Sequence, residues 1–134
     1  MSGAQPLLQG SRMLVVGGGV GNGRGIAFGV AAAGARVAVA DLDVDRAREV
    51  AQKITEQGGE AHPLRCNVLV PEDIERVTAE TVNALGGLDS VVTVVGGYSL
   101  FAPWTPVQAA SPQAYRPGMD ERPYRSVRTS PQHW

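Results

Sequence analysis

Cysteine, lysine and histidine are scarce in this chain of 134 residues. The one cysteine, Cys66, excludes a disulfide framework, and the only histidines, His62 and His133, leave no Cys/His set for a zinc site. The one lysine is Lys53, so a mechanism that needs a lysine elsewhere is excluded. We expect Cys66 to be a small buried apolar residue and His62 to lie in a surface loop.

An excess of one charge and long apolar runs are also absent. The 12 basic and 13 acidic residues give a net charge of −1, which excludes a strongly basic nucleic-acid binder and an acidic tail. No run of about 20 apolar residues exists for a membrane span. Residues 1–12 lack the pattern of a signal peptide. The sequence therefore predicts a soluble cytoplasmic protein with no nucleic-acid or membrane partner.

Strand-like and helix-like segments alternate along roughly the first hundred residues. Apolar residues make up 43% of the chain, so it has the material for a core. Asp43 can cap one of the predicted helices, and Pro71 suits the first turn of another. The predicted strands span residues 13–17, 36–40, 61–68 and 88–95, and the predicted helices span residues 21–34, 43–58 and 71–86.

This alternation predicts an α/β fold with a doubly wound parallel sheet and right-handed crossovers. The strand order would be 3-2-1-4, with the fourth strand at an edge. Because residues 91–95 read as a strand buried on both faces, an uncovered edge there would favour association. The predicted domain, residues 1–102, therefore resembles part of a larger one.

A change in composition follows at about residue 103. Six of the nine prolines lie between Pro103 and Pro131, and no helical or strand period is visible there. We interpret residues 103–134 as an irregular tail whose scattered arginines and isolated tryptophans make no nucleic-acid surface.

A glycine-rich segment, residues 16–25 (VGGGVGNGRG), lies between the first predicted strand and helix. Glycines there let a pyrophosphate approach the backbone, and a helix N-terminus supplies unpaired N–H donors. A tight turn without a ligand is the alternative. A Walker-type loop fits poorly, because Arg24 and Gly25 stand where it needs Lys and Ser or Thr. Arg24 is interpreted as a solvated or salt-bridging residue.

Four ordered motifs resemble those of the short-chain dehydrogenase/reductase family. The glycine loop is similar to Thr-Gly-x-x-x-Gly-x-Gly, and Ala40-Asp41 closes the second strand as in NAD-preferring members. Cys66-Asn67-Val68 resembles Cys-Asp-Val, and residues 88–96 (LDSVVTVVG) resemble Leu-Asp-x-Leu-Val-Asn-Asn-Ala-Gly. The resemblance implies a Rossmann-like dinucleotide-binding domain, truncated after about the fourth strand.

The resemblance also implies cofactor contacts for eight residues. Asp41 would bind the adenosine ribose hydroxyls and repel a 2′-phosphate, so NAD(H) is favoured over NADP(H); a simple strand-end cap is its alternative role. The other implied contacts are the pyrophosphate loop at Gly17, Gly21 and Gly23, a phosphate at the Asn22 N–H, the adenine at Asn67 and Val68, and the nicotinamide ribose at Gly96.

The chain departs from the family pattern at several positions. Val16 replaces the Thr that braces the glycine loop, and Thr93 and Val94 replace two Asn that stabilise the sheet. Asn67 for Asp is a milder change that keeps an acceptor. The Val16 departure predicts a less well braced glycine loop, and the departures at Thr93 and Val94 predict a less stable sheet centre.

The family's catalytic Ser and Tyr-x-x-x-Lys pair have no counterpart. Ala102, Met119 and Arg128 stand four residues after the three tyrosines, Tyr98, Tyr115 and Tyr124, so we assign no catalytic residue and the substrate is unknown.

We therefore expect this chain to be a truncated or frameshifted form of the family's enzyme that does not catalyse hydride transfer. Read one base downstream, residues 116–121 can encode Asp-Arg-Val-Trp-Met-Asn, which resembles the family's next helix. The alternatives are a natural short form that serves as a non-catalytic dinucleotide-binding or interaction module, associating through its exposed sheet edge, and an unstable product without a function.

Overall fold

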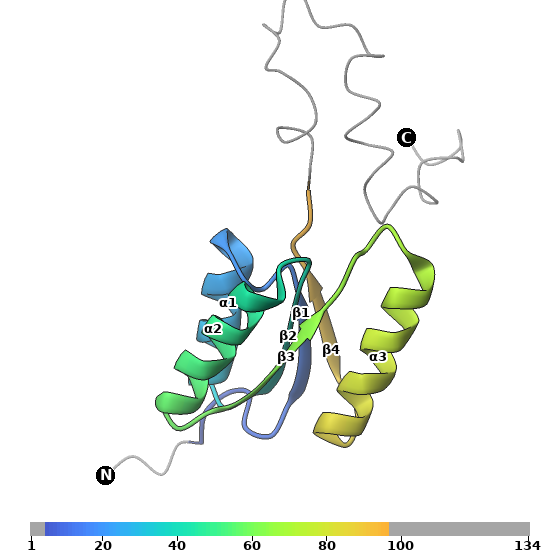
Figure 1. Cartoon of the computed structure of the whole chain (residues 1–134). Helices are drawn as coiled ribbons and strands as arrows, with labels where there is room; N and C mark the ends of the chain where they lie inside the picture. The colour runs from blue at the N-terminus through green and yellow to red at the C-terminus, as the bar shows by residue number, and fades with distance from the viewer. Residues whose placement is uncertain (1–4, 97–134) are drawn as a thin grey trace, which may run out of the picture. The chain divides into compact units, whose positions relative to one another are not determined.

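The computed structural model describes residues 5–96, which form a parallel sheet with helices on both faces (Figure 1). The expected tail at residues 103–134 and all three tyrosines lie outside these residues. The strands are β1 (Arg12–Val16), β2 (Arg36–Asp41), β3 (Glu60–Arg65) and β4 (Ser90–Thr93), and the helices are α1 (Gly21–Ala32), α2 (Val44–Glu56) and α3 (Pro71–Leu85).

The sheet has the order β3-β2-β1-β4, and all its strand pairs are parallel, as the sequence predicts. Helices α1 and α2 cover one face and α3 covers the other, which is the doubly wound arrangement (Figure 1). Val15, Val37 and Val39 are fully buried because β1 and β2 lie between these layers. Ile54 of α2 belongs to the same core.

Local signals in the sequence set the ends of two helices. The Asp43 side chain caps α2 by accepting a hydrogen bond from the Asp45 N–H at 3.0 Å. Pro71 occupies the first turn of α3, and Gly86 ends that helix with φ of 77°. Both helix starts agree with the prediction.

Strands β3 and β4 are shorter than their sequences predict. β3 ends at Arg65, whose ladder partner Asp41 is the last residue of β2. β4 ends at Thr93, which pairs with Val16 at the end of β1. A strand cannot continue its ladder after the neighbouring strand has ended, so residues 66–68 form a loop instead.

His62 is a correction to the sequence analysis, since it lies within β3 and not in a surface loop. Its Nε2 is 3.2 Å from Oε1 of Glu60, which the ring contacts along one face of the strand. Cys66 is buried, as expected, and the apolar surroundings raise the pKa of its thiol.

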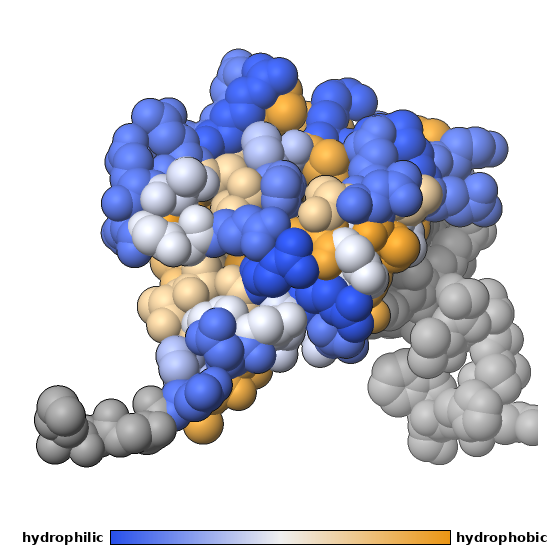
Figure 2. Space-filling model, turned by 90° about the horizontal axis from the view of Figure 1, so that it is seen from below, coloured by the Kyte–Doolittle hydropathy of each residue, from blue (hydrophilic) through white to orange (hydrophobic). Residues whose placement is uncertain are grey.

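Two arginine–carboxylate pairs join the strands at the end of the sheet where they begin. Arg12 donates from Nε and Nη2 to Asp89 at 3.0 and 2.9 Å. Arg36 donates to Glu60 at 2.5 and 3.0 Å and also to the Leu85 carbonyl at 2.7 Å. Seen from this end, the surface is largely hydrophilic, with hydrophobic residues between the charges (Figure 2).

Strand β4 forms the edge of the described sheet beside β1. Val91 is 54% exposed, whereas Val92 packs partly against the core. Within residues 5–96, no helix is long and apolar enough to cross a membrane. The same residues hold no cluster of three or more His, Cys, Asp or Glu side chains suited to a metal ion.

Candidate functional site

The predicted cofactor residues from the first three strands gather at the end of the sheet where the strands finish. Gly17 follows β1, Asp41 is the last residue of β2, and Asn67 and Val68 follow β3. Parallel strands place all these ends on one edge, where ligands bind in doubly wound sheets. Gly96 lies three residues beyond β4 and is exposed.

The glycine loop begins with two backbone hydrogen bonds to the end of β2. The N–H groups of Gly17 and Gly18 both donate to the Ala40 carbonyl, at 2.8 and 3.1 Å. Gly17 has φ of 80°, in the left-handed region that favours glycine. A Cβ at Gly17 would also collide with the Val94 carbonyl oxygen, so both conformation and space require glycine there.

The start of α1 lies directly against this loop. A Cβ at Gly23 would collide with the Gly17 carbonyl oxygen, so only glycine allows the helix to approach so closely. Gly21 has φ of 58° at the first position of the helix, and Asn22 is exposed beside it. The three predicted positions therefore form one continuous turn from strand to helix.

The N-terminus of α1 differs from the other two helix starts in the described part of the chain. Val20 is its N-cap residue and makes no side-chain hydrogen bond, and the first turn contains no acidic residue. In contrast, α2 is capped by Asp43, and α3 carries Glu72 and Asp73 in its first turn. The first N–H groups of α1 thus remain available to an anion, which the helix dipole also favours.

Asp41 is a buried carboxylate, 8% exposed, that connects two loops. Its Oδ2 accepts the Gly19 N–H at 2.9 Å, and its Oδ1 accepts the Asp43 N–H at 3.0 Å. The strand-end cap considered for Asp41 is therefore present. A carboxylate has about four acceptor positions, so these two bonds leave capacity for hydroxyl donors.

Two further glycines and an arginine belong to the site, and the sequence analysis did not single them out for it. A Cβ at Gly18 would lie 2.9 Å from Val39 Cγ1. A Cβ at Gly19 would lie 2.7 Å from Asp41 Oδ2 and 2.8 Å from Arg46 Cβ. The sequence signal for Gly18 and Gly19 was the run of three glycines, residues 17–19, where the family motif has one glycine. No feature of the sequence indicated that Arg46 lies beside this loop.

The loop after β3 is held by bonds from its own residues. The Asn67 N–H donates to Asp73 Oδ2 at 2.7 Å, and Asn67 Oδ1 accepts the Leu69 N–H at 3.0 Å. The Cys66 N–H donates to the Asp41 carbonyl at 3.0 Å, which joins this loop to the end of β2. Asn67 and the half-buried Val68 therefore lie in a braced turn beside Asp41.

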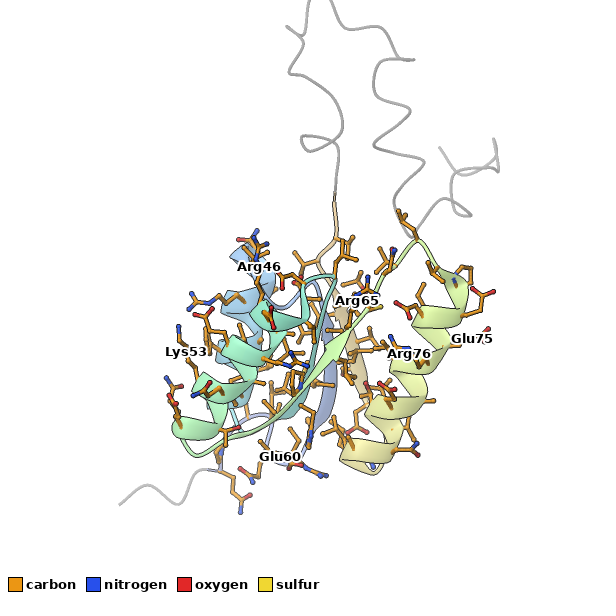
Figure 3. The ribbon with its side chains drawn as sticks, in the orientation of Figure 1. Arg46, Lys53, Glu60, Arg65, Glu75 and Arg76 are labelled. Carbon is orange, nitrogen blue, oxygen red and sulfur yellow. The ribbon has the colours of Figure 1, made fainter. Side chains whose placement is uncertain are left out.

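Asp73 and Arg76 of α3 support that loop, and neither was anticipated. The Asn67 N–H, followed by the Arg76 guanidinium, holds the pKa of the Asp73 carboxyl below its usual value. Arg76 also donates to the Arg65 carbonyl at the end of β3, at 2.6 Å. Figure 3 shows Arg65 and Arg76 between the sheet and α3.

The chain's only lysine lies apart from these loops. Lys53 Nζ pairs with Glu49 Oε1 at 2.8 Å along α2, on the side of the helix away from the sheet (Figure 3). A role for Lys53 at the strand ends is thereby excluded.

The arrangement fits a dinucleotide better than a bare turn. The close packing of the glycine loop excludes a Cβ at Gly17, Gly19 or Gly23, and the α1 N-terminus that the loop leads into is uncapped. The buried Asp41 carboxylate lies at the end of the neighbouring strand. A phosphate suits the first two features, and a ribose diol suits the third.

Comparison with known proteins agrees with this geometry. Residues 11–117 match the family model described as short chain dehydrogenase. The chain is 33% identical over 90 residues to 7alpha-hydroxysteroid dehydrogenase of Escherichia coli (strain K12), covering 67% of this chain and 35% of that protein. It is 42% identical over 82 residues to 2,5-dichloro-2,5-cyclohexadiene-1,4-diol dehydrogenase of Sphingobium indicum, covering 61% and 32%.

Solved structures give the same picture. A dehydrogenase/reductase from Sinorhizobium meliloti 1021 matches with a TM-score of 0.72 and 31% identity, over 90% of this chain and 49% of that one. A 7 alpha-hydroxysteroid dehydrogenase complexed with NADH and 7-oxo glycochenodeoxycholic acid matches with a TM-score of 0.69 and 30% identity, over 81% and 41%. The chain thus spans less than half the length of these proteins.

Proposed function

This chain belongs to the short chain dehydrogenase family, and from that premise we propose that it binds NAD(H) at the strand ends of its sheet. The observation that carries the proposal is the close fit between Gly23 and the Gly17 carbonyl beneath an uncapped helix start. Backbone N–H groups at such a start bind phosphate without a positively charged side chain. The reported NADH complex of a similar protein supports the same ligand.

In this proposal the pyrophosphate lies over Gly17, Gly21 and Gly23, with a phosphate at the Asn22 N–H. The adenine lies beside Asn67 and Val68, in the turn that Asp73 braces. Gly96 lies beside the nicotinamide ribose. The contacts proposed for residues 17–68 describe one extended ligand along the ends of the first three strands.

Asp41 is proposed to select NAD(H) over NADP(H). Its buried carboxylate has acceptor capacity left for the two ribose hydroxyls, whereas a 2′-phosphate would bring like charge next to it. A neutral residue at this position would remove that repulsion but would also loosen two loops.

The chemistry of the family is hydride transfer between a nicotinamide and an alcohol or carbonyl group. The bound cofactor supplies this chemistry. We propose that this chain provides the cofactor-binding part and does not turn over alone. The only lysine is Lys53, which is paired with Glu49 on α2, so no Tyr-x-x-x-Lys pair is available as acid and base. Its cytoplasmic location also remains a prediction.

Titration of the purified chain with NADH, followed by assay with a panel of carbonyl substrates, tests the proposal. We expect saturable binding, weaker for NADPH than for NADH, and no turnover. Turnover would show that this chain does not need a Tyr-x-x-x-Lys pair for hydride transfer. The absence of saturable binding of either cofactor would overturn the proposed function.

A second candidate function is an interaction module that associates through β4. The favouring observation is the 54% exposure of Val91 on a strand that pairs, within residues 5–96, with β1 alone. An apolar edge strand offers unpaired backbone groups to another strand. This candidate is compatible with cofactor binding, since the edge and the glycine loop are separate features.

A further inference from the structure

Asn67 lies in the turn that joins β3 to α3 (Figure 1). Its backbone N–H donates to Asp73 Oδ2 at 2.7 Å, and its carbonyl accepts the Val70 N–H at 3.0 Å. Its side-chain Oδ1 accepts the Leu69 N–H at 3.0 Å. Within residues 5–96, only the amide nitrogen Nδ2 of this residue has no hydrogen-bond partner, and it carries two N–H donors.

The bond to Leu69 fixes which way the side-chain amide of Asn67 is turned. A backbone N–H can only donate, so the side-chain atom that faces it is the oxygen and not the nitrogen. The two backbone bonds hold the residue on either side, so it cannot turn over without breaking them. The turn therefore leaves one polar group of Asn67 to a ligand, and that group is a donor.

This turn is bonded to the residue that is proposed to hold the adenosine ribose. The Cys66 N–H donates to the Asp41 carbonyl at 3.0 Å, and Asn67 is the next residue along the chain. The base of a dinucleotide is joined directly to that ribose. A ribose held by the Asp41 carboxylate therefore brings the base to the half-buried Asn67.

A carboxylate and a free amide nitrogen recognise opposite features of a purine base. A carboxylate, which the family motif has at this position, only accepts, so it favours the 6-amino group of adenine and repels the 6-oxo oxygen of hypoxanthine. The Asn67 Nδ2 donates, so it can pair with the ring nitrogen N7, which both bases have, or with a 6-oxo oxygen. Asn67 thus lacks the charge and the acceptor that would reject a 6-oxo purine.

We propose that Asn67 makes this chain tolerant of the purine base, so that it binds nicotinamide hypoxanthine dinucleotide about as well as NAD⁺. The inference rests on the proposed function, because it needs a dinucleotide to bind at the strand ends. It goes beyond that function by naming the group that faces the base and the wider class of ligand that this group accepts.

Asn83 supplies a matched control on α3. It is exposed and lies near the end of the helix, whereas the turn of Asn67 precedes the start of that helix. Asn67→Asp and Asn83→Asp add the same negative charge, so a general effect of charge on an anionic ligand would appear in both. A carboxylate at position 67 can still accept the Leu69 N–H, so Asn67→Asp keeps this bond of the turn.

The test measures dissociation constants for NAD⁺ and nicotinamide hypoxanthine dinucleotide by calorimetry on the full chain and on both variants. We expect the two constants of the wild-type chain to agree within about threefold. Asn67→Asp should raise the ratio of the hypoxanthine constant to the NAD⁺ constant about tenfold, because a charged acceptor then faces the 6-position. Asn83→Asp should leave the ratio unchanged.

Three results would overturn the inference while the proposed function stands. They are a wild-type chain that binds NAD⁺ at least tenfold more tightly than the hypoxanthine dinucleotide, an unchanged ratio in Asn67→Asp, and an equal rise in Asn83→Asp. The first needs no variant, so it decides even where Asn67→Asp does not fold. If neither dinucleotide binds the wild-type chain, the proposed function fails and this inference fails with it.

Discussion

At the scale of single residues, the glycines of the loop differ in what requires them. A Cβ at Gly23 would collide with the Gly17 carbonyl oxygen, and a Cβ at Gly17 would collide with the Val94 carbonyl oxygen. Gly25, two residues further along α1 than Gly23, has no atom within 4 Å of the place where its Cβ would be. The same substitution therefore has opposite consequences at Gly23 and Gly25. This difference shows that the packing of the loop against α1 requires glycine at position 23 and not at position 25.

We predict that Gly23→Ala abolishes saturable NADH binding, because the added methyl group forces the start of α1 away from the Gly17 carbonyl. Gly25→Ala should preserve binding and raise the stability of the chain by about 1 kcal/mol, the difference in helix propensity. NADH titration and urea unfolding of both variants check this. Equal binding by Gly23→Ala and the wild-type chain would contradict it.

Asp41 is a residue with two tasks that substitution alone cannot separate. Its oxygens accept the N–H groups of Gly19 and Asp43, and they are also the proposed acceptors for ribose hydroxyls. Replacing Asp41 by Asn would turn one acceptor into a donor facing a backbone N–H. Loss of binding in such a variant would therefore report on loop geometry as well as on the ribose contact.

At the scale of elements, different interactions connect the two ends of the sheet. Arginine–carboxylate ion pairs connect the ends where the strands begin, and backbone hydrogen bonds connect the loops where the strands finish. Arg36 connects β2 to β3 through Glu60, and Arg12 connects β1 to Asp89, the residue before β4. Paired arginines lower the pKa of Glu60 to about 2 and that of Asp89 to about 2. For Glu60, the Arg36 hydrogen bond is the larger cause and the His62 contact the next.

We predict that acid destabilises the fold through these two carboxyls. Their folded pKa values lie below the ordinary values of 4.5 and 3.8, so the unfolded chain binds more protons as the pH falls. The stabilisation is therefore present above about pH 5 and is lost as the pH falls toward about 2. The free energy of unfolding in urea, measured across that range, should decrease with decreasing pH.

Glu60→Gln and Asp89→Asn should each make this pH dependence weaker. The matched control is Glu75→Gln, on the outer side of α3 in Figure 3, which should keep it. Salt at about 1 M should also weaken the dependence in the wild-type chain, since the pairs are partly exposed. An unchanged slope in both carboxyl variants would contradict the prediction.

At the scale of the whole molecule, the described sheet has one well-covered centre and an exposed edge. The core fills the space between the sheet and α1 and α2, while Val77, Thr81 and Leu85 of α3 are buried on the other face. At the β4 edge, Val91 remains exposed. The chain covers 35% of the Escherichia coli relative and 32% of the Sphingobium one, so it spans about a third of the length of these two proteins.

We predict that this edge drives self-association of the full chain. Val91→Lys should lower the apparent molecular mass at high protein concentration, because a charged residue on an edge strand opposes strand pairing. Val82→Lys, at a 40% exposed position on α3, is the control and should not change it. Light scattering during gel filtration checks both, and a wild-type chain that is monomeric at every concentration would contradict the prediction.

The sequence by itself determined the fold class, the strand order, the Asp43 cap of α2 and the place of Pro71 in the first turn of α3. Apolar runs, helical spacing and turn residues act over a few neighbouring positions, so their consequences can be read locally. The Gly17-x-x-x-Gly21-x-Gly23 spacing likewise located the loop, because the strand and helix around it are adjacent in the chain. The roles assigned there to the cofactor contacts remain predictions.

Only the tertiary structure decided the ends of β3 and β4, the place of His62 and the surroundings of the glycine loop. A strand ends where its partner in the ladder ends, and that partner is distant in sequence, as with Asp41 and Arg65. Likewise, Arg46 lies beside Gly19 only because β2 and α2 fold back along β1. Contacts of this kind depend on packing between elements, for which a single sequence carries no local signal.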